Sequence, residues 1–281
     1  MPNVVATNTW SLNAQNSLYQ SERTLSTAME RLGSGLRVNS AKDDAAGLAI
    51  ATGMSSQVRG MNVAIRNAND GISMSQTAES ALGSIGDTLQ RMRELAVQAA
   101  NGTYNSGDRA NLDTEFQELA NEISRVIDNT EFNGIDILAG GASGASGGGI
   151  DFQIGANTEA DNQINIQIAD QHSAGGLTSL GTATVSTAGA ATSAMTTIDN
   201  ALDSITSTRA ELGAAQNRLD ATIDNLNSSI ENQEAAKSRI MDADFAKETA
   251  RLSQAQVLQQ AGTSMLAQAN QAPQAVLSLL R

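Results

Sequence analysis

The stretch that decides the fold runs from Ser40 to Ala100 and reads SAKDDAAGLAIATGMSSQVRGMNVAIRNANDGISMSQTAESALGSIGDTLQRMRELAVQAA. Its apolar residues recur every three or four positions without losing phase, and only Ser75 is polar in the series. This spacing is typical of a long helix with a heptad-type stripe. A helix of roughly 58 residues would be about 87 Å long, so it needs an equally long partner. The stripe comprises Ile50, Met54, Val58, Met61, Ile65, Ala68, Ile72, Ala78, Leu82, Ile85, Leu89, Met92 and Ala96.

A second heptad pattern, between Ile198 and Ile230, supplies that partner. Its steps alternate between four and three residues, so the two long helices should form a left-handed coiled coil. Two polar residues, Arg209 and Gln216, interrupt the seam, and we expect them to fix its register. The seam comprises Ile198, Leu202, Ile205, Arg209, Leu212, Gln216, Leu219, Ile223, Leu226 and Ile230.

Shorter helices are predicted at both ends of the chain. Leucines spaced by seven indicate one from Trp10 to Leu36, which Gly33 and Gly35 should break. Ser40 with Asp43 then resembles an N-cap for the long helix.

The last helix should begin at a cap supplied by Asp242 or Asp244. It should end before Pro273, because proline disrupts a helix interior.

The middle of the chain carries several local signals. The turn-forming segment 101–108 precedes a helix that should return antiparallel to the first long one. The dipeptide Asn133-Gly134 predicts a tight β-hairpin. Residues 139–192 are rich in Gly, Ala, Ser and Thr, with alternating isoleucines near 150–154 and 164–168. We expect two short strands in a small insert at the surface.

Composition supports a thin helical assembly over a broad globular core. Only 2% of the residues are aromatic, and the two prolines lie near the ends of the chain. The net charge of −13 disfavours nucleic acid and anionic membranes as partners. No cysteine is present, and no segment resembles a secretory signal or a membrane span. The sequence therefore predicts a mainly α fold: an elongated antiparallel bundle, or coiled coil, of N- and C-terminal rods with a hairpin and a small insert.

Residues that could support catalysis are sparse. His172 is the single histidine and lies in the polar insert, where a solvated loop residue is the simplest interpretation. The glycine run at 140–149 lacks the Lys-Ser/Thr of a phosphate loop and resembles a linker. Asp43 and Asp44 fit helix capping. We therefore predict no enzyme activity, no cofactor and no metal.

Several segments resemble bacterial flagellin, the subunit of the flagellar filament. In the first half these are SGLRVNSAKDDAAGLAIA, RNANDGIS, LQRMRELAVQAANGTY and FNG. In the second half they are LGAAQNRLDATI and the run from SRIMDADFAKETARL to the terminal AQANQAPQAVLSLLR. The resemblance covers about residues 3–138 and 195–281 and leaves the insert unmatched.

The resemblance implies a division of the chain. Residues 1–40 and 243–281 would form the terminal helices of the inner filament core. Residues 41–138 and 193–242 would form the outer core, and 139–192 the variable insert. Glycines such as Gly60 and Gly86 are then interpreted as close-packing positions. Changing either to alanine should raise monomer helicity and impair assembly.

The resemblance also implies partners: a homopolymeric helical filament, an export chaperone, the filament cap and hook-filament junction proteins. Export would occur unfolded through the flagellar type III channel, giving an extracellular location. A host Toll-like receptor would contact Gln90, Arg91, Leu95 and Glu115, which could equally be a subunit contact. Polymerisation and chaperone contacts fall on Val276, Leu277, Leu279 and Leu280.

Two other functions remain to be weighed. A hook-filament junction protein would share the terminal helices but typically carries less of the DDAAGLAI and AQANQ patterns. A metal or hydrolytic site in the insert would need more than one His, so nothing in the sequence supports it.

Overall fold

The computed structural model describes residues 7–140, 149–173 and 177–278, and its contacts divide the chain into two units. We call residues 57–230 the central unit, and residues 1–56 with 231–281 the terminal unit. The described residues are mainly helical, with two small β-hairpins, which confirms the predicted fold class. None of the described helices is both long and apolar enough to span a lipid bilayer.

The first long helix, α2 (Ala45–Ala100), is continuous over 56 residues and passes Asp70-Gly71 without interruption. Its stripe is buried from Val58 onward except at Ile65 and Ile72, which are partly buried, whereas Ile50 is 53% exposed. Ser75, the polar member of the stripe, is buried and donates its hydroxyl to the Gly71 carbonyl at 2.8 Å. That bond satisfies the hydroxyl locally, which explains how a polar side chain is tolerated at a core position.

The second long helix, α5 (Ala188–Met241), is the predicted partner. Its seam residues Ile198, Leu212 and Leu219 are completely buried in the core that α2 also lines. Both polar seam residues reach one carboxylate of α2, that of Glu79. Gln216 Nε2 donates to Glu79 Oε2 at 3.1 Å, and Arg209 Nη2 lies 3.8 Å from Oε1.

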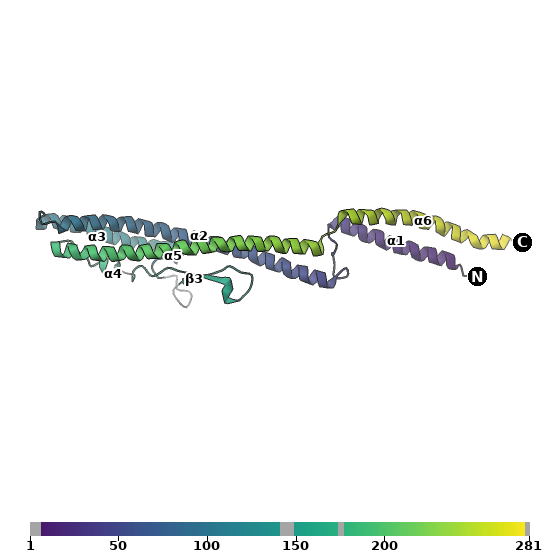
Figure 1. The fold of residues 1–281 in the computed structure, drawn as a ribbon, viewed down its shortest axis with the longest axis horizontal. Helices are drawn as coiled ribbons and strands as arrows, with labels where there is room; N and C mark the ends of the chain where they lie inside the picture. The colour runs from purple at the N-terminus through teal and green to yellow at the C-terminus, as the bar shows by residue number, and fades with distance from the viewer. Residues whose placement is uncertain (1–6, 141–148, 174–176, 279–281) are drawn as a thin grey trace. The chain divides into compact units, whose positions relative to one another are not determined.

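The third helix of the central unit, α3 (Ser106–Asn129), lies beside α2 and α5 (Figure 1). Asn105 and Asp108 form a capping box at its start, since each side chain accepts a hydrogen bond from the other residue's backbone N–H. Phe116 is the largest completely buried side chain of the core. The central unit therefore has a core of its own.

The predicted hairpin is confirmed. Strands β1 (Glu131–Phe132) and β2 (Ile135–Asp136) pair antiparallel around Asn133 and Gly134, which have φ of 53° and 75°. These positive values are what a two-residue type I′ turn requires, and an Asn-Gly dipeptide adopts them at little cost.

The insert contains the two predicted strands, and one face of it also contributes side chains to the central core. Strand β3 (Gly149–Gln153) pairs antiparallel with β4 (Gln163–Gln167), which follows the short 3₁₀ helix η1 (Ala160–Asn162). The inward side chains of β4, of the following residues and of α4 (Leu177–Leu180) are buried in the central core. These residues are Ile164, Ile166, Ile168, Leu177, Leu180 and Val185.

The physical reason is the alternation along β4, where every second residue is an isoleucine that faces the central core and the polar residues between them face outward. A hydrogen bond from a side chain to the backbone joins the insert to α2, because Asn67 Nδ2 donates to the Gln153 carbonyl at 2.8 Å. Because small residues dominate the composition of the insert, the sequence did not predict this apolar face.

The terminal unit contains α1 (Thr9–Ser34) and α6 (Phe245–Ser278), which lie side by side (Figure 1). Gly35 ends α1 in the left-handed conformation, with φ of 73°, and its N–H donates to the Arg31 carbonyl at 2.9 Å. The prediction that Gly33 also breaks α1 is wrong, because Gly33 is helical. One left-handed glycine suffices as a C-cap.

The predicted cap of α2 requires a correction. Asp44, and not Ser40 with Asp43, caps α2, since Asp44 Oδ1 accepts from the Gly47 N–H at 2.8 Å. Asp43 instead closes the turn before the helix, where its Oδ2 accepts from the backbone N–H groups of Asn39 and Ser40. Asp side chains accept hydrogen bonds both in turns and at helix N-caps, so the sequence alone placed the cap at Asp43, one residue before Asp44.

The end of α6 also differs from the prediction, because the helix continues through Pro273 to Ser278. A proline inside a helix costs about 3 kcal/mol, in part because the carbonyl four residues earlier loses its N–H donor. Here that carbonyl, of Ala269, accepts a hydrogen bond from Asn8 Nδ2 at 2.7 Å. A contact from the other end of the chain thus offsets part of the cost, which no local sequence pattern could indicate.

Candidate interaction surfaces

The seam between α1 and α6 is built from small side chains. Ala28 and Ala255 are 1% and 2% exposed, and a Cβ added to Gly262 would lie 3.3 Å from Leu18 Cδ1. Glu248, Ala255, Gly262 and Ala269 are spaced by seven residues, so they share one face of α6. Small residues let two helices approach closely, but they remove little apolar area from water. The α1–α6 pair is therefore thinly stabilised.

Large apolar side chains lie outside that seam. Leu12 and Tyr19, seven residues apart, share a face of α1, and Leu258 and Met265 share a face of α6. Scattered exposed leucines need no explanation, whereas this many on two helices indicate a surface that another molecule covers. We call the set the terminal apolar surface: Trp10, Leu12, Tyr19, Met29, Phe245, Val257, Leu258 and Met265, which are 50–73% exposed.

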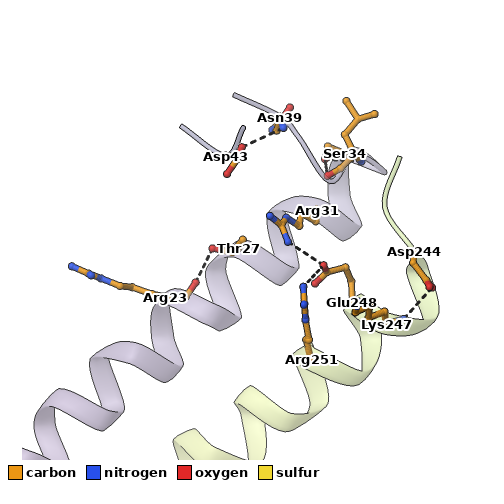
Figure 2. Close-up of polar contacts among 11 residues, drawn as sticks. Arg23, Thr27, Arg31, Ser34, Asn39, Asp43, Asp244, Lys247, Glu248 and Arg251 are labelled. Atoms are coloured by element: carbon orange, nitrogen blue, oxygen red, sulfur yellow. Dashed lines mark hydrogen bonds and ion pairs between the residues drawn. The ribbon is translucent and has the colours of Figure 1, made fainter. Parts of the chain in front are cut away.

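A carboxylate is enclosed at one end of the pair (Figure 2). The Glu248 side chain is 6% exposed, and its Oε1 accepts from Arg31 Nη1 of α1 at 3.2 Å and Arg251 Nη1 of α6 at 2.8 Å. Removing one partner of such a pair would leave a buried charge uncompensated. The cluster therefore holds the end of α1 against the start of α6.

The connectors next to this cluster pair with each other. Leu36 and Asp242 form an antiparallel bridge, and Arg37 Nη2 donates to the Ile240 carbonyl. Asp244 caps α6, since its Oδ1 accepts from the Lys247 N–H at 3.1 Å (Figure 2). This decides between the two caps that the sequence allowed.

Asp43, in the turn before α2, carries a perturbed carboxyl group (Figure 2). The backbone N–H of Ser40 and then the Ser40 hydroxyl donate to it, which lowers the pKa of the Asp43 carboxyl below its ordinary value.

The predicted receptor residues gather where α2 faces α3. Arg91 Nη2 lies 2.9 Å from Glu115 Oε1, and Arg91 Nη1 lies 3.0 Å from Glu94 Oε2. The hydrogen bond to Glu115, and then that to Glu94, raises the pKa of Arg91. Gln90 is exposed beside this pair. Leu95 is 1% exposed, so its side chain lies beneath this surface and in the core.

The predicted polymerisation residues fall largely outside the described part of the chain. The backbone of Val276 and Leu277 is helical and belongs to α6, but their side chains lie outside the described residues. Leu279 and Leu280 lie outside them altogether. Their role therefore stays a prediction.

The ring of the single histidine makes one polar contact with the described residues. His172 Nε2 lies 2.8 Å from Asp128 Oδ1 at the end of α3, and both side chains are about half exposed. Within residues 7–140, 149–173 and 177–278, no group of three His, Cys, Asp or Glu side chains could hold a metal ion.

Sequence reasoning missed the contacts that join α1 to α6, namely Asn8 with Ala269 and Arg31 with Glu248. The seven-residue spacing of Glu248, Ala255 and Gly262 was a usable signal. The large leucines of α1 give a stronger periodic signal than these small residues of α6.

Comparison with known proteins identifies the family. Residues 5–143 match the profile of the bacterial flagellin N-terminal helical region, and residues 195–280 match that of the C-terminal helical region. The chain is 45% identical to a flagellin of Halalkalibacterium halodurans, with 90% of this chain and 91% of that protein covered. The chain belongs to the bacterial flagellin family. Membership makes it a structural subunit of the bacterial flagellar filament.

Other relatives agree with this family. The chain is 43% identical to the flagellar filament 33 kDa core protein of Treponema phagedenis, with 95% and 96% of the two chains covered. A solved structure described as a flagellar hook-associated protein, from Vibrio parahaemolyticus, shares the fold. It has a TM-score of 0.57, is 14% identical, and covers 71% of this chain and 100% of that one. At that identity it shows the fold alone. The two family matches and the flagellin relatives favour a flagellin over a junction protein.

Proposed function

We propose that this flagellin polymerises by covering the terminal apolar surface with neighbouring subunits. The observation that carries the proposal is that α1 and α6 bury alanines in their seam while Tyr19, Leu258 and Met265 remain 50–64% exposed. Covering such side chains is worth about 25 cal/mol per Å² of apolar area. Contacts of this kind that do not close into a ring continue as a helical filament.

The thin seam also supports coupling between folding and assembly. A two-helix pair with few buried large side chains has little to offset the entropy of ordering its chain. The terminal helices would then become fully ordered when neighbours pack on them. On this proposal residues 1–40 and 243–281 line the inner core of the filament. Residues 41–138 and 193–242 form the outer core, and 139–192 a variable segment that contributes core residues.

Seeded growth tests the proposal. Purified chain added to filament fragments should give micrometre-long filaments by electron microscopy, and Leu258→Glu should block elongation. A matched control, Asn227→Glu, adds the same charge at an exposed polar position of α5 in the central unit. Equal elongation by Leu258→Glu and Asn227→Glu would rule out the terminal apolar surface as the subunit contact.

Membership of the flagellin family also supports a proposal for export and handling before assembly. The chain would leave the cell unfolded through the flagellar type III channel, with a chaperone on α6 and its tail. It would then assemble beneath the filament cap, beyond the hook-filament junction proteins. It would act outside the cell as a structural protein without enzymatic activity. Co-purification of the chaperone with the full chain, and its loss after deletion of α6, tests the chaperone contact.

A second proposed role is recognition by a host Toll-like receptor at Gln90, Arg91 and Glu115. Their exposure on adjoining faces of α2 and α3 favours it, and arginine is frequent among residues that dominate binding energies. Arg91→Ala should weaken binding of the receptor ectodomain by about tenfold or more. Arg125→Ala is the matched control, because Arg125 is also an exposed arginine that pairs with a glutamate, Glu122 of α3. Leu95→Ala should act through core stability, since the Leu95 side chain is buried.

A further inference from the structure

Asn8 connects the beginning of α1 to the last turns of α6. Its Oδ1 accepts from the Ser11 N–H at 3.2 Å, so it is the N-cap of α1. Its Nδ2 donates to the Ala269 carbonyl at 2.7 Å, across 261 positions of sequence. The amide orientation is determined by its partners, because a backbone N–H can only donate and a carbonyl can only accept.

The Ala269 carbonyl is the one that Pro273 leaves without a donor. In an α-helix, the carbonyl of each residue accepts from the N–H four positions later. That position is Pro273, which has no N–H, yet α6 continues to Ser278. Asn8 therefore reaches the carbonyl of α6 whose intrahelical bond is chemically impossible.

A neighbouring bond fixes the same turn. Ser11 Oγ donates to Asn270 Oδ1 at 2.8 Å, so two consecutive residues of α6 are bound to the first turn of α1. Ser11 is 8% exposed, which places this bond in the seam and partly shields it from water. Hydrogen bonds shielded in this way contribute more than exposed ones, and their unpaired partners cost more.

We infer that Asn8 is a positioning residue that substitutes for the missing N–H of Pro273 and thereby keeps α6 helical through its last turns. The start of α1 and the end of α6 then order together, because one side chain satisfies both. The consequence for filament growth rests on the proposed function, since those turns lead into the predicted polymerisation residues.

A double-mutant cycle on the full chain tests the inference. Asn8→Asp keeps an N-cap acceptor of equal quality but loses the donor to Ala269. Pro273→Ala restores the N–H within α6, so the donor is no longer needed. Asn8→Asp should raise the critical concentration for seeded growth by roughly five- to thirtyfold. In the Pro273→Ala background the same change should raise it by less than about threefold.

The matched control is Asn227→Asp, which adds the same charge at an exposed position of α5 in the central unit, outside the terminal apolar surface, and should leave the critical concentration unchanged. An equal effect of Asn8→Asp with proline or alanine at position 273 would overturn the inference. Failure of the unmodified chain to elongate would instead contradict the proposed function.

Hydrogen exchange gives a second measurement that does not depend on Pro273→Ala assembling. In filaments of Asn8→Asp, the amides of residues 270–278 should exchange faster while the first turn of α1 stays protected. Faster exchange confined to the first turn of α1 would show that Asn8 acts only as a cap, and would contradict the inference.

Discussion

The central and terminal units use helices of the same kind with opposite distributions of large side chains. The central unit buries Phe116, Met74, Leu82 and Ile85 at 1% exposure or less. The described terminal unit buries small residues such as Ala28 and Ala255, and leaves Trp10 73% exposed. Since stability follows the apolar area removed from water, the central unit can fold as a monomer. On the proposed function, the terminal unit is completed by other subunits.

The strongest way to break this comparison is to remove the chain from Gln274 onward. Filament growth should be abolished, because the deleted segment carries the predicted polymerisation residues. The central unit should keep its helices, since its core lies within residues 57–230. Sedimentation and electron microscopy measure assembly, and circular dichroism measures helicity. Normal filaments from the truncated chain would refute the assignment of the C-terminal contact.

A core substitution should affect only the monomer stability of the central unit. Phe116→Ala removes a completely buried ring and should lower the free energy of unfolding by about 3–5 kcal/mol. Tyr19→Ala is the control in the terminal unit, because Tyr19 is 64% exposed and its loss should change that free energy by about 0.5 kcal/mol or less. Urea unfolding followed by circular dichroism measures both. Similar losses would show that the terminal unit also has a core of its own.

Two glycines of α2 sharpen the comparison at a smaller scale. A Cβ at Gly60 would lie 2.8 Å from the Ala156 Cβ, so Gly60→Ala should destabilise by about 1–3 kcal/mol despite its better helix propensity. Gly86→Ala meets no atom within 4 Å and should stabilise by about 1 kcal/mol.

Thermal unfolding of both variants measures these changes. The sequence predicted that both variants would raise monomer helicity, whereas the structure predicts a loss of stability for Gly60→Ala and a gain for Gly86→Ala. A stabilising Gly60→Ala would show that the insert can move away at Ala156.

The smallest expected effect concerns the turn before α2. The Asp43 carboxyl has a lowered pKa, so the stability it gives is present above its unfolded pKa of about 4 and is lost as the pH falls through the lowered value. Exchange of the Ser40 amide should accelerate across that acidic window relative to the intrinsic rate. Asp43→Asn should remove the pH dependence. An unchanged profile in Asp43→Asn would assign the effect to another carboxylate.

The sequence predicted the elements that depend on local chemistry or on long periodicity. Both long helices, the Asn133-Gly134 hairpin and the insert strands belong to this group, because period and turn type are readable within short windows. The core contacts of the insert, the cap at Asp44 and the passage of α6 through Pro273 were missed. Each depends on a tertiary contact or a competing local bond, such as that from Asn8 to Ala269.

The candidate surfaces were only partly predictable for the same reason. Arg91 and Glu115, which are distant in sequence, lie together across α2 and α3. Leu95 is not a member of the listed stripe but lies three residues after Met92, on an adjoining part of the helix, and its burial could have been expected from that spacing. Whether these residues bind a receptor stays a prediction.

The hydrogen bond between Glu79 and Gln216 joins residues 137 positions apart. Helix α2 is therefore synthesised long before the helix that completes its core. Proteins dominated by such distant pairings fold slowly, because the entropy cost of closing a large loop comes before the favourable free energy of the contacts. The same separation that makes the core late to form would give the proposed export channel time to engage a chain that is still open.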